Sequence, residues 1–182
     1  VIFSGVRFLF KTFPDGNESY NKGNDLIIKG LAKYRELNKN IEIHFVEKGE
    51  DVVAAKALCS EYGLDDVTIW HKEMKFTDLL SLYRLADVCF DQVGSHWIGA
   101  IGFYALWLGK PLIANDLRVV DFGIWSNSAP ILSANNAEGV FEKLKFIDNL
   151  DVRLDISRRA MEFADKHLGP DVALRSIFEI DA

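Results

Sequence analysis

The chain contains 182 residues, of which 49% are hydrophobic and 26% are charged, so it can form one globular domain with a substantial core. Its formal net charge of −6 argues against a general nucleic-acid-binding protein, because contacts to phosphates need clustered lysines and arginines. No apolar run reaches the roughly 20 residues that span a bilayer. We therefore expect a protein of the cytoplasm or of the cytoplasmic membrane surface, without a transmembrane segment.

The cysteines and histidines of the chain do not indicate a metal site. Cys59 and Cys89 are too few for a disulfide framework, and we expect both to be buried thiols. No spacing of histidine and cysteine suits zinc, so we predict neither a metal nor another cofactor. The sequence begins at Val1 in an apparent strand without an initiator methionine, from which we infer a fragment of a longer protein.

Strand-like and helical patterns alternate along the sequence. Short β-rich runs predict strands over residues 1–10, 41–46, 67–70, 88–91, 112–114 and 131–133. Apolar residues at helical spacing predict helices over residues 24–37, 51–62, 77–86, 137–149, 152–167 and 172–180, and a further helix begins near residue 99. We expect Gly63 to end the second helix, and Thr77 or its neighbour to cap the third.

This order of elements predicts an α/β fold, namely one Rossmann-like domain over residues 1–182 with a parallel sheet and helices on both faces. Ligands of such folds bind beyond the carboxyl ends of the strands. The loops in which we expect a site are therefore residues 11–22, 47–50, 71–76, 91–98 and 115–123. Their polar side chains and glycines favour that location.

Residues 96–114 are the most informative stretch. A strand ends at Phe90 and Asp91, a polar loop follows, and a helix begins near Gly99. Glycines at a helix entrance let a ligand approach the backbone, and the free N–H groups of the first turn attract anions. The pattern is typical of a phosphate site at the edge of a parallel sheet.

The same stretch resembles the glutamate-rich nucleotide-sugar motif of retaining GT-B glycosyltransferases of family 4. The matching positions are Gly99, Ala105, Gly109, Pro111, Ile113 and Ala114. His96 and Tyr104 stand where that family has its two glutamates. A subset of the family also has Asp-Gln at the end of the strand and an aromatic residue before the glycine, and this chain resembles it at Asp91, Gln92 and Trp97. The resemblance implies the C-terminal, donor-binding half of a two-domain enzyme, whose N-terminal, acceptor-binding half is missing from this sequence.

The resemblance also implies the role of a basic residue. Lys22, followed by Gly23, stands where family members have the lysine that pairs with the nucleotide diphosphate. The family's arginine, about five residues earlier, falls on Asn17, so Arg7 or Lys48 are candidates to replace it. A lysine at this place is physically reasonable, because its compact charge reaches a phosphate.

Other donor-binding residues follow from the same comparison. Met74 belongs to the loop whose backbone reads the base in family members. His96 is expected near the sugar or a phosphate, and Trp97 is either a platform for the sugar or a cap on the core. Tyr104 can stack or donate one hydrogen bond, but it lacks the two acceptors with which a carboxylate binds ribose hydroxyls. The alternative for His96 and Tyr104 is a purely structural role, and for Trp107 we expect a place in the core.

We therefore predict the nucleotide-sugar-binding domain of a retaining, hexosyltransferase-type enzyme that transfers a sugar to a glycan, lipid or small-molecule acceptor, as in polysaccharide biosynthesis. The nucleotide diphosphate sugar is a substrate and not a cofactor. The isolated domain should be inactive, because the acceptor half is absent. Two alternatives remain: a degenerate, non-catalytic GT-B-like domain, and a sugar-nucleotide epimerase-type Rossmann domain.

Overall fold

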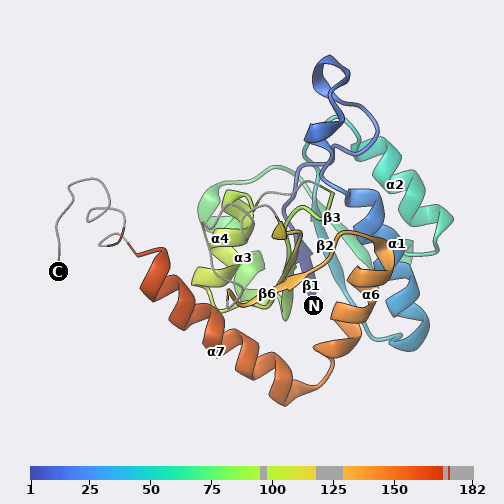
Figure 1. The fold of residues 1–182 in the computed structure, drawn as a ribbon. Coiled ribbons are helices and arrows are strands. Elements are labelled where there is room, and N and C mark those ends of the chain that lie inside the picture. Colours follow the sequence, from blue (N-terminus) through green and yellow to red (C-terminus); the bar gives the residue numbers. More distant parts are fainter. Residues whose placement is uncertain (95–97, 118–128, 170–171, 173–182) are drawn as a thin grey trace.

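The computed structural model describes residues 1–94, 98–117, 129–169 and 172. They form a six-stranded, fully parallel sheet with the strand order β3-β2-β1-β4-β5-β6 (Figure 1). The strands are β1 (Ile2–Ser4), β2 (Ile43–Val46), β3 (Thr68–His71), β4 (Val88–Phe90), β5 (Leu112–Ala114) and β6 (Ile131–Ser133). The predicted α/β architecture is confirmed.

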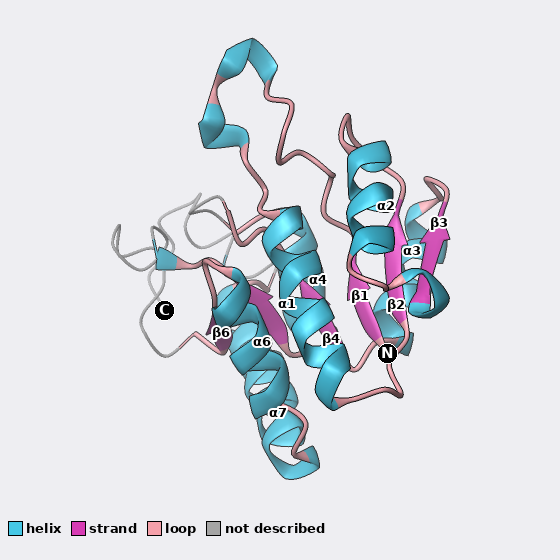
Figure 2. Cartoon of the chain, turned by 90° about the vertical axis from the view of Figure 1, so that its right-hand side faces the viewer, coloured by secondary structure: helices cyan, strands magenta, loops and turns pink. Residues whose placement is uncertain are grey.

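Helices cover both faces of this sheet (Figure 2). The α-helices are α1 (Asn24–Leu37), α2 (Val52–Glu61), α3 (Phe76–Leu85), α4 (Ala100–Trp107), α6 (Ala137–Phe146) and α7 (Leu150–His167), and the short 3₁₀ helices are η1 (Pro14–Gly16), η2 (Glu18–Tyr20) and η3 (Asp65–Val67). Helices α1, α2 and α6 share one hydrophobic cluster with the sheet, whereas α3, α4 and the second half of α7 share the other.

Side chains alternate between these two clusters along each strand, as the pleat of a strand requires. In β2, Ile43 and Phe45 point to the α1 side, whereas Val46 belongs to the α4 side. Every residue of β1, β2, β4 and β5 is buried, which is typical of strands covered on both faces. Cys59 and Cys89 are both buried free thiols, as expected.

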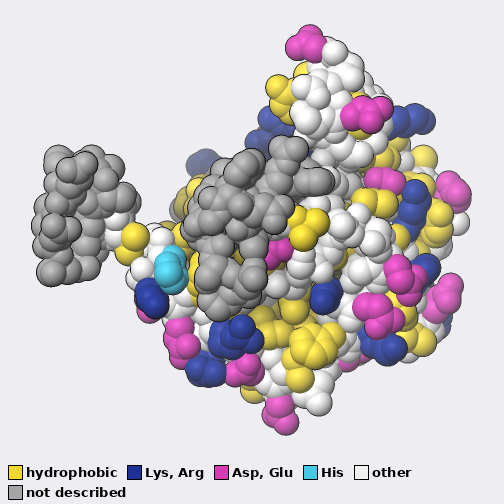
Figure 3. Space-filling model, in the orientation of Figure 1, with side chains coloured by type: hydrophobic (Ala, Val, Ile, Leu, Met, Phe, Trp, Pro, Cys, Tyr) yellow, Lys and Arg dark blue, Asp and Glu magenta, His cyan; other side chains and the backbone are white. Residues whose placement is uncertain are grey.

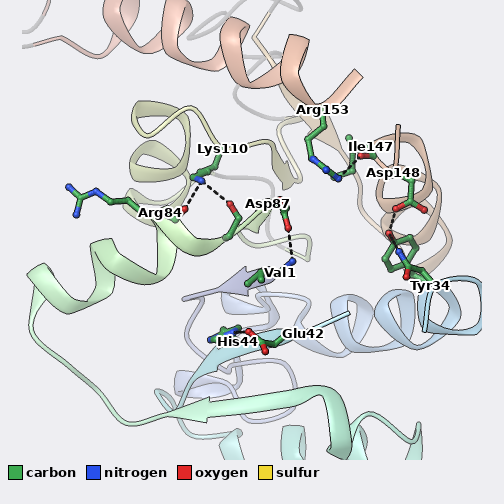
Figure 4. Close-up of polar contacts among 12 residues, drawn as sticks. Val1, Tyr34, Glu42, His44, Arg84, Asp87, Lys110, Ile147, Asp148 and Arg153 are labelled. Atoms are coloured by element: carbon green, nitrogen blue, oxygen red, sulfur yellow. Dashed lines mark hydrogen bonds and ion pairs between the residues drawn. The ribbon is translucent and has the colours of Figure 1, made fainter. Parts of the chain in front are cut away.

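Helices α1 and α6 pack closely through Gly30. A Cβ atom on Gly30 would lie 2.4 Å from Cγ1 of Val140, so the two helices can approach only because this position lacks a side chain. The Tyr34 hydroxyl donates a hydrogen bond to the Asp148 carboxylate at the end of α6 (Figure 4). Burial first, and then this hydrogen bond, raises the pKa of Tyr34 to about 12.

Several predicted boundaries were wrong. The first strand ends at Ser4 and not at residue 10, because the following backbone bonds to loops instead of strands: Phe8 N–H donates to the Lys48 carbonyl. Helix α6 ends at Phe146, since the Asn149 side chain accepts the N–H groups of residues 151 and 152 and so begins α7. Helix α3 begins at Phe76 after Lys75, with no side-chain cap. Gly63 has the positive φ expected after a helix. Of the predicted helix 172–180, only residue 172 lies within the described ranges.

The segment between β1 and α1 projects from the body of the domain (Figures 1 and 2). It contains η1 and η2, and its residues 14–20 are all exposed. In the space-filling view, acidic and basic side chains are interspersed over the described surface (Figure 3). Among the described residues, no helix is long and apolar enough to cross a membrane.

Candidate functional site

The strand order reverses between β1 and β4, and we call this place the switch point of the sheet. The chain moves from β1 outward through β2 to β3, and then returns to β4 on the other side of β1. In α/β folds, ligands bind at the carboxyl ends of the strands beside such a reversal, near the loops that follow the two central strands. Here these loops are residues 5–23 and 91–99, which contain most of the predicted site residues.

The backbone of Lys22 joins these two loops. Its N–H donates to the Leu9 carbonyl at 2.7 Å, and its carbonyl accepts the N–H groups of Val93 and Gly94 at 3.1 and 3.3 Å. Gly23, with a φ of 68°, begins α1 directly behind it. A Cβ atom on Gly23 would lie 2.3 Å from the Gly94 nitrogen, so only glycine fits this contact.

The Lys22 side chain is half-buried at this junction. Burial lowers its pKa below the usual value, Asp91 opposes that shift, and Arg7 adds to it. Neither Lys22 nor Arg7 forms a salt bridge with another described residue. Two cations that form no ion pair within the described part of the chain therefore lie within electrostatic range of each other at the switch point.

Asp91 caps helix α4. The side chain is 3% exposed, and its carboxylate accepts the N–H groups of Gln92, Gly99 and Gly102 at 2.7, 2.6 and 3.2 Å. Burial raises the pKa of Asp91, although these donors and Lys22 oppose the rise. The N–H of Gly99, which the sequence suggested for a phosphate, thus already has an acceptor. Ala100 and Ile101 carry the first-turn N–H groups that Asp91 does not take.

Gln92 is buried beside Asp91, and its carbonyl accepts the N–H of Asn115 at 3.0 Å. This hydrogen bond connects the ends of β4 and β5. Asn115 is itself buried, and its amide lies 3.5 Å from the Val93 carbonyl. Buried polar groups therefore hold the loop that follows β4 in place.

Arg7 and Lys48 line a cavity of about 380 Å³ beside the switch point, together with Gly49, Glu50 and Glu73. Nζ of Lys48 lies 3.4 Å from the Glu73 carboxylate. Gly49 has a φ of 110° and packs under Phe8, with only 2.4 Å between its ideal Cβ position and the Phe8 carbonyl. Lys48 is thus near Arg7, but its charge is partly neutralised.

The loop that follows β3 contains Met74, which is half-buried. At the end of β3, directly before this loop, Nε2 of His71 lies 2.8 Å from Nδ1 of His44, and the two rings are nearly parallel. Burial, and then His44, lowers the pKa of His71. His71 is therefore committed to a contact within the protein.

Tyr104 lies in a groove between α3 and α4. Its ring centroid is 4.9 Å from that of Phe76 and 6.3 Å from that of Tyr83. The groove holds a cavity of about 230 Å³, to which Trp107 also contributes. Trp107 is 65% exposed, so its predicted place in the core was wrong: an apolar helix pattern does not reveal which side faces the sheet.

His96 and Trp97 lie outside the described residues, so their predicted contacts with the sugar stay predictions. The same holds for residues 118–123 of the loop that follows β5. The described part of the candidate site consequently consists of the loops around the switch point and the groove of Tyr104.

Asp51 is a structural anchor of the site that the sequence did not reveal. It is 3% exposed, and one carboxylate oxygen accepts the N–H groups of Phe10, Lys11 and Thr12 at 2.7 to 3.0 Å. Burial opposes ionisation of Asp51, but these donors outweigh it and hold the pKa of the carboxyl below its usual value. An aspartate before a helix usually caps that helix, and this one holds the base of the projecting segment instead.

We expect Asp51→Asn to lower the free energy of unfolding by about 1.5–3 kcal/mol at neutral pH, the range for hydrogen bonds to a charged group. A group whose pKa is depressed by folding contributes stability above its unfolded pKa of about 3.9, and that contribution is lost as the pH falls through the folded value. Urea unfolding at neutral and acidic pH should therefore show the difference from wild type shrinking in acid. Asp15→Asn in the exposed segment is the control, and a difference independent of pH would contradict the assignment.

Comparison with known proteins finds the same architecture in glycosyltransferases. No family model matches the chain, and no curated protein matches it. Among solved structures, a variant of TarM from S. aureus, in complex with Fondaparinux, alpha-GlcNAc-glycerol and UDP, is 16% identical with a TM-score of 0.73, and the match covers 100% of this chain and 35% of that one.

Two further structures agree. The C-terminal domain of LpcC, a glycosyl transferase group 1 family protein from Francisella tularensis, is 16% identical with a TM-score of 0.71, covering 93% of this chain and 86% of that domain. Anabaena Alr3699/HepE in complex with UDP and glucose is 14% identical with a TM-score of 0.71. The match covers 97% of this chain and 47% of that one. The chain thus spans about a third to a half of the longer proteins, and it has the fold of the C-terminal domain of GT-B glycosyltransferases.

Proposed function

We propose that this chain is the donor-binding domain of a retaining glycosyltransferase of the hexosyltransferase type. The observation that carries the proposal is the switch point, where Lys22 and Arg7 lie beside a loop–helix junction without a salt bridge to another described residue. This is where α/β folds bind phosphates. The fold similarity to TarM and HepE, whose structures contain UDP, supports a nucleotide sugar as the ligand.

The proposed chemistry is stabilisation of the leaving group. When the bond between the anomeric carbon and the terminal phosphate oxygen breaks, negative charge develops on the nucleoside diphosphate. Lys22 and Arg7 would neutralise that charge, and Lys48 is the next cation along the edge. Because preorganised charges of this kind stabilise a transition state without a metal, we propose that the domain needs no cofactor.

The remaining residues would hold the donor in place. Asp91 and Gln92 keep the β4 loop and α4 in position, and Gly99, whose N–H donates to Asp91, would place the first turn of α4 beside the donor. Tyr104 would contact the nucleoside through its ring, together with Phe76. The loop of Met74 would follow the base, and His96 and Trp97 would contact the sugar. The acceptor, a glycan, a lipid or a small molecule, would bind a second half of the protein.

The second candidate is a non-catalytic domain of the same fold. Its supporting observation is Tyr104, which occupies an aromatic cluster and offers ribose one hydroxyl in place of two carboxylate oxygens. Calorimetric titration with UDP, GDP and ADP, with and without EDTA, distinguishes the two. We expect saturable binding of at least one diphosphate that EDTA does not change. No binding of any of them would support the non-catalytic domain.

A further inference from the structure

Strand β3 lies at the edge of the sheet and is held differently on its two faces. On the side of α1 and α2, the ring of Trp70 packs against that of Phe45 in β2, with 5.2 Å between the ring centroids. Because side chains alternate along a strand, Ile69 and His71 lie on the other face. Ile69 is 40% exposed there, whereas His71 contacts the buried side chain of His44 in β2. The second face of β3 is therefore joined to β2 through a polar contact.

Glu42, His44 and His71 form a series of hydrogen bonds across β2 and β3. Nε2 of His44 lies 2.6 Å from the Glu42 carboxylate (Figure 4), and its Nδ1 lies 2.8 Å from Nε2 of His71. The ring centroids of the two histidines are 5.0 Å apart and the rings are nearly parallel, so they meet edge to edge, as a hydrogen bond between them requires. We call the rings of His44 and His71 the imidazole pair. In β1, the neighbour of His44 is the uncharged Phe3.

The positions of the protons follow from the partners of each nitrogen. A carboxylate only accepts, so Nε2 of His44 carries a hydrogen, and Nδ1 of the neutral ring then has the lone pair. That lone pair accepts the hydrogen on Nε2 of His71. One further proton fits on Nδ1 of His71, which takes no part in the contact. A second one would have to enter between the facing nitrogens, where it would replace the hydrogen bond by two opposed N–H groups on two cations.

The charges that act on the imidazole pair come from a small set of described groups. Burial, and then the other ring of the pair, lowers the pKa of His71. The hydrogen bond from the pair is the first cause that lowers the pKa of Glu42, and the amino group of Val1 adds to it. Helix α3 covers this face of the sheet, and its charged residues, Asp78 and Arg84, are exposed. The state of the pair is therefore governed by its own protons and by Glu42.

The loop that follows β3 is tied to the end of β2 by contacts that respond differently to pH. Lys72 donates to the Glu47 carboxylate, and Nζ of Lys48 lies 3.4 Å from the Glu73 carboxylate. Ordinary lysines and glutamates keep their charges between about pH 5 and 8, whereas histidine titrates near pH 6.5. The imidazole pair is therefore the contact that a mild change of pH can break.

We propose that the imidazole pair and Glu42 form a proton-sensitive latch, which holds the end of β3 against β2 at neutral pH and releases it when both rings are protonated in mild acid. Two histidines that titrate freely take up two protons, whereas the closed pair accommodates one. The latch is therefore fully present above the ordinary histidine pKa of about 6.5, and it is lost as the pH falls below that value. The proposal does not rest on donor binding, although the released segment includes the loop of Met74.

Hydrogen exchange of the Glu47 backbone amide tests the latch, because this N–H donates to the His71 carbonyl at 2.7 Å. We expect its protection factor, corrected for the intrinsic exchange rate, to fall about thirtyfold between about pH 7.5 and pH 5, the effect of one additional proton on a group with a pKa of about 6.5. The Cys89 amide, which donates to the Pro111 carbonyl at 2.9 Å, should keep its protection. Equal losses at both amides would indicate global unfolding and overturn the proposal, as would a Glu47 amide that is indifferent to pH.

Variants of the 182-residue chain distinguish the latch from a merely structural contact. In His71→Gln, the side-chain amide can pair with His44 whether that ring is neutral or charged, so the protection of the Glu47 amide should no longer depend on pH. Glu42→Gln removes the charge that favours the protonated ring, so the latch should open at a lower pH. His167→Asn, at the exposed end of α7, is the matched control and should behave as wild type.

Two results from these variants would overturn the proposal. One is a loss of protection in acid that is as large in His71→Gln as in wild type. The other is a Glu42→Gln chain whose Glu47 amide is less protected at every pH but opens at the same pH as wild type, because that result is expected of a contact that only stabilises the strand.

Discussion

Replacing Lys22 with alanine is expected to weaken the binding of a nucleoside diphosphate between about tenfold and about 150-fold. Losing a hydrogen bond to a charged group costs about 1.5–3 kcal/mol, and each 1.4 kcal/mol is a factor of ten. Lys22 lies at the strand reversal without a salt bridge to any described residue, so its charge is available to a phosphate. Titration calorimetry with UDP, GDP and ADP on wild type and variant measures the change.

The control for this variant is Lys39→Ala. Lys39 is exposed in the loop that precedes β2, at the amino end of the sheet, and its removal changes the net charge by the same amount. It should not alter the affinity. Unchanged affinity in Lys22→Ala would contradict the assignment and move the phosphate site to Arg7 and Lys48, which line the neighbouring cavity.

The pH dependence of nucleotide binding gives a second test of the contribution that the charge of Lys22 makes to affinity. Burial lowers the pKa of Lys22, so the side chain loses its charge at a lower pH than an ordinary lysine does. The affinity of the wild-type chain should therefore fall as the pH rises toward this lowered value. That fall should be absent in Lys22→Ala.

The sheet and its helices could be predicted because each element carries its own local signal. Apolar runs such as residues 43–46 and the helical spacing of Ile27, Leu31 and Tyr34 depend on burial on one or both sides. Strand ends were less predictable, since residues 5–10 are as apolar as β1 but hydrogen bond to loops. The position of a strand end depends on partners far along the chain.

The candidate site could be predicted only in part, because some of its contacts also join residues that are far apart in the sequence. Lys22, Asp91 and Gln92 were candidates because they match the glycosyltransferase motif, and the structure places them in the two loops beside the switch point. The role of Asp51 could not be predicted, because its three N–H partners lie about 40 residues earlier. The exposure of Trp107 could not be predicted either, since composition makes α4 apolar on every side and only packing decides which side is covered.

Gly23→Ala is expected to be the most damaging single-methyl change in the site. At a φ of 68°, a residue with a Cβ atom is strained, and this strain lowers the free energy of unfolding by roughly 1–2 kcal/mol. The added Cβ would also lie 2.3 Å from the Gly94 nitrogen and 2.8 Å from Cγ2 of Val93. A backbone atom cannot move aside as a flexible side chain does. We therefore expect this overpacking to lower the free energy of unfolding further, by about 1–3 kcal/mol.

Gly16→Ala separates these two contributions. Gly16 has the same φ of 68°, and nothing lies within 4 Å of its ideal Cβ position, so its substitution should cost only the backbone term. Urea unfolding of both variants measures the difference, which is the energy of the contact between the two loops. In folded Gly23→Ala, the hydrogen bonds from Val93 and Gly94 to the Lys22 carbonyl should be weakened, and nucleotide affinity should fall with them. If the two variants unfold with equal free energies, the loops do not meet at Gly23, and the switch point is more open than its geometry indicates.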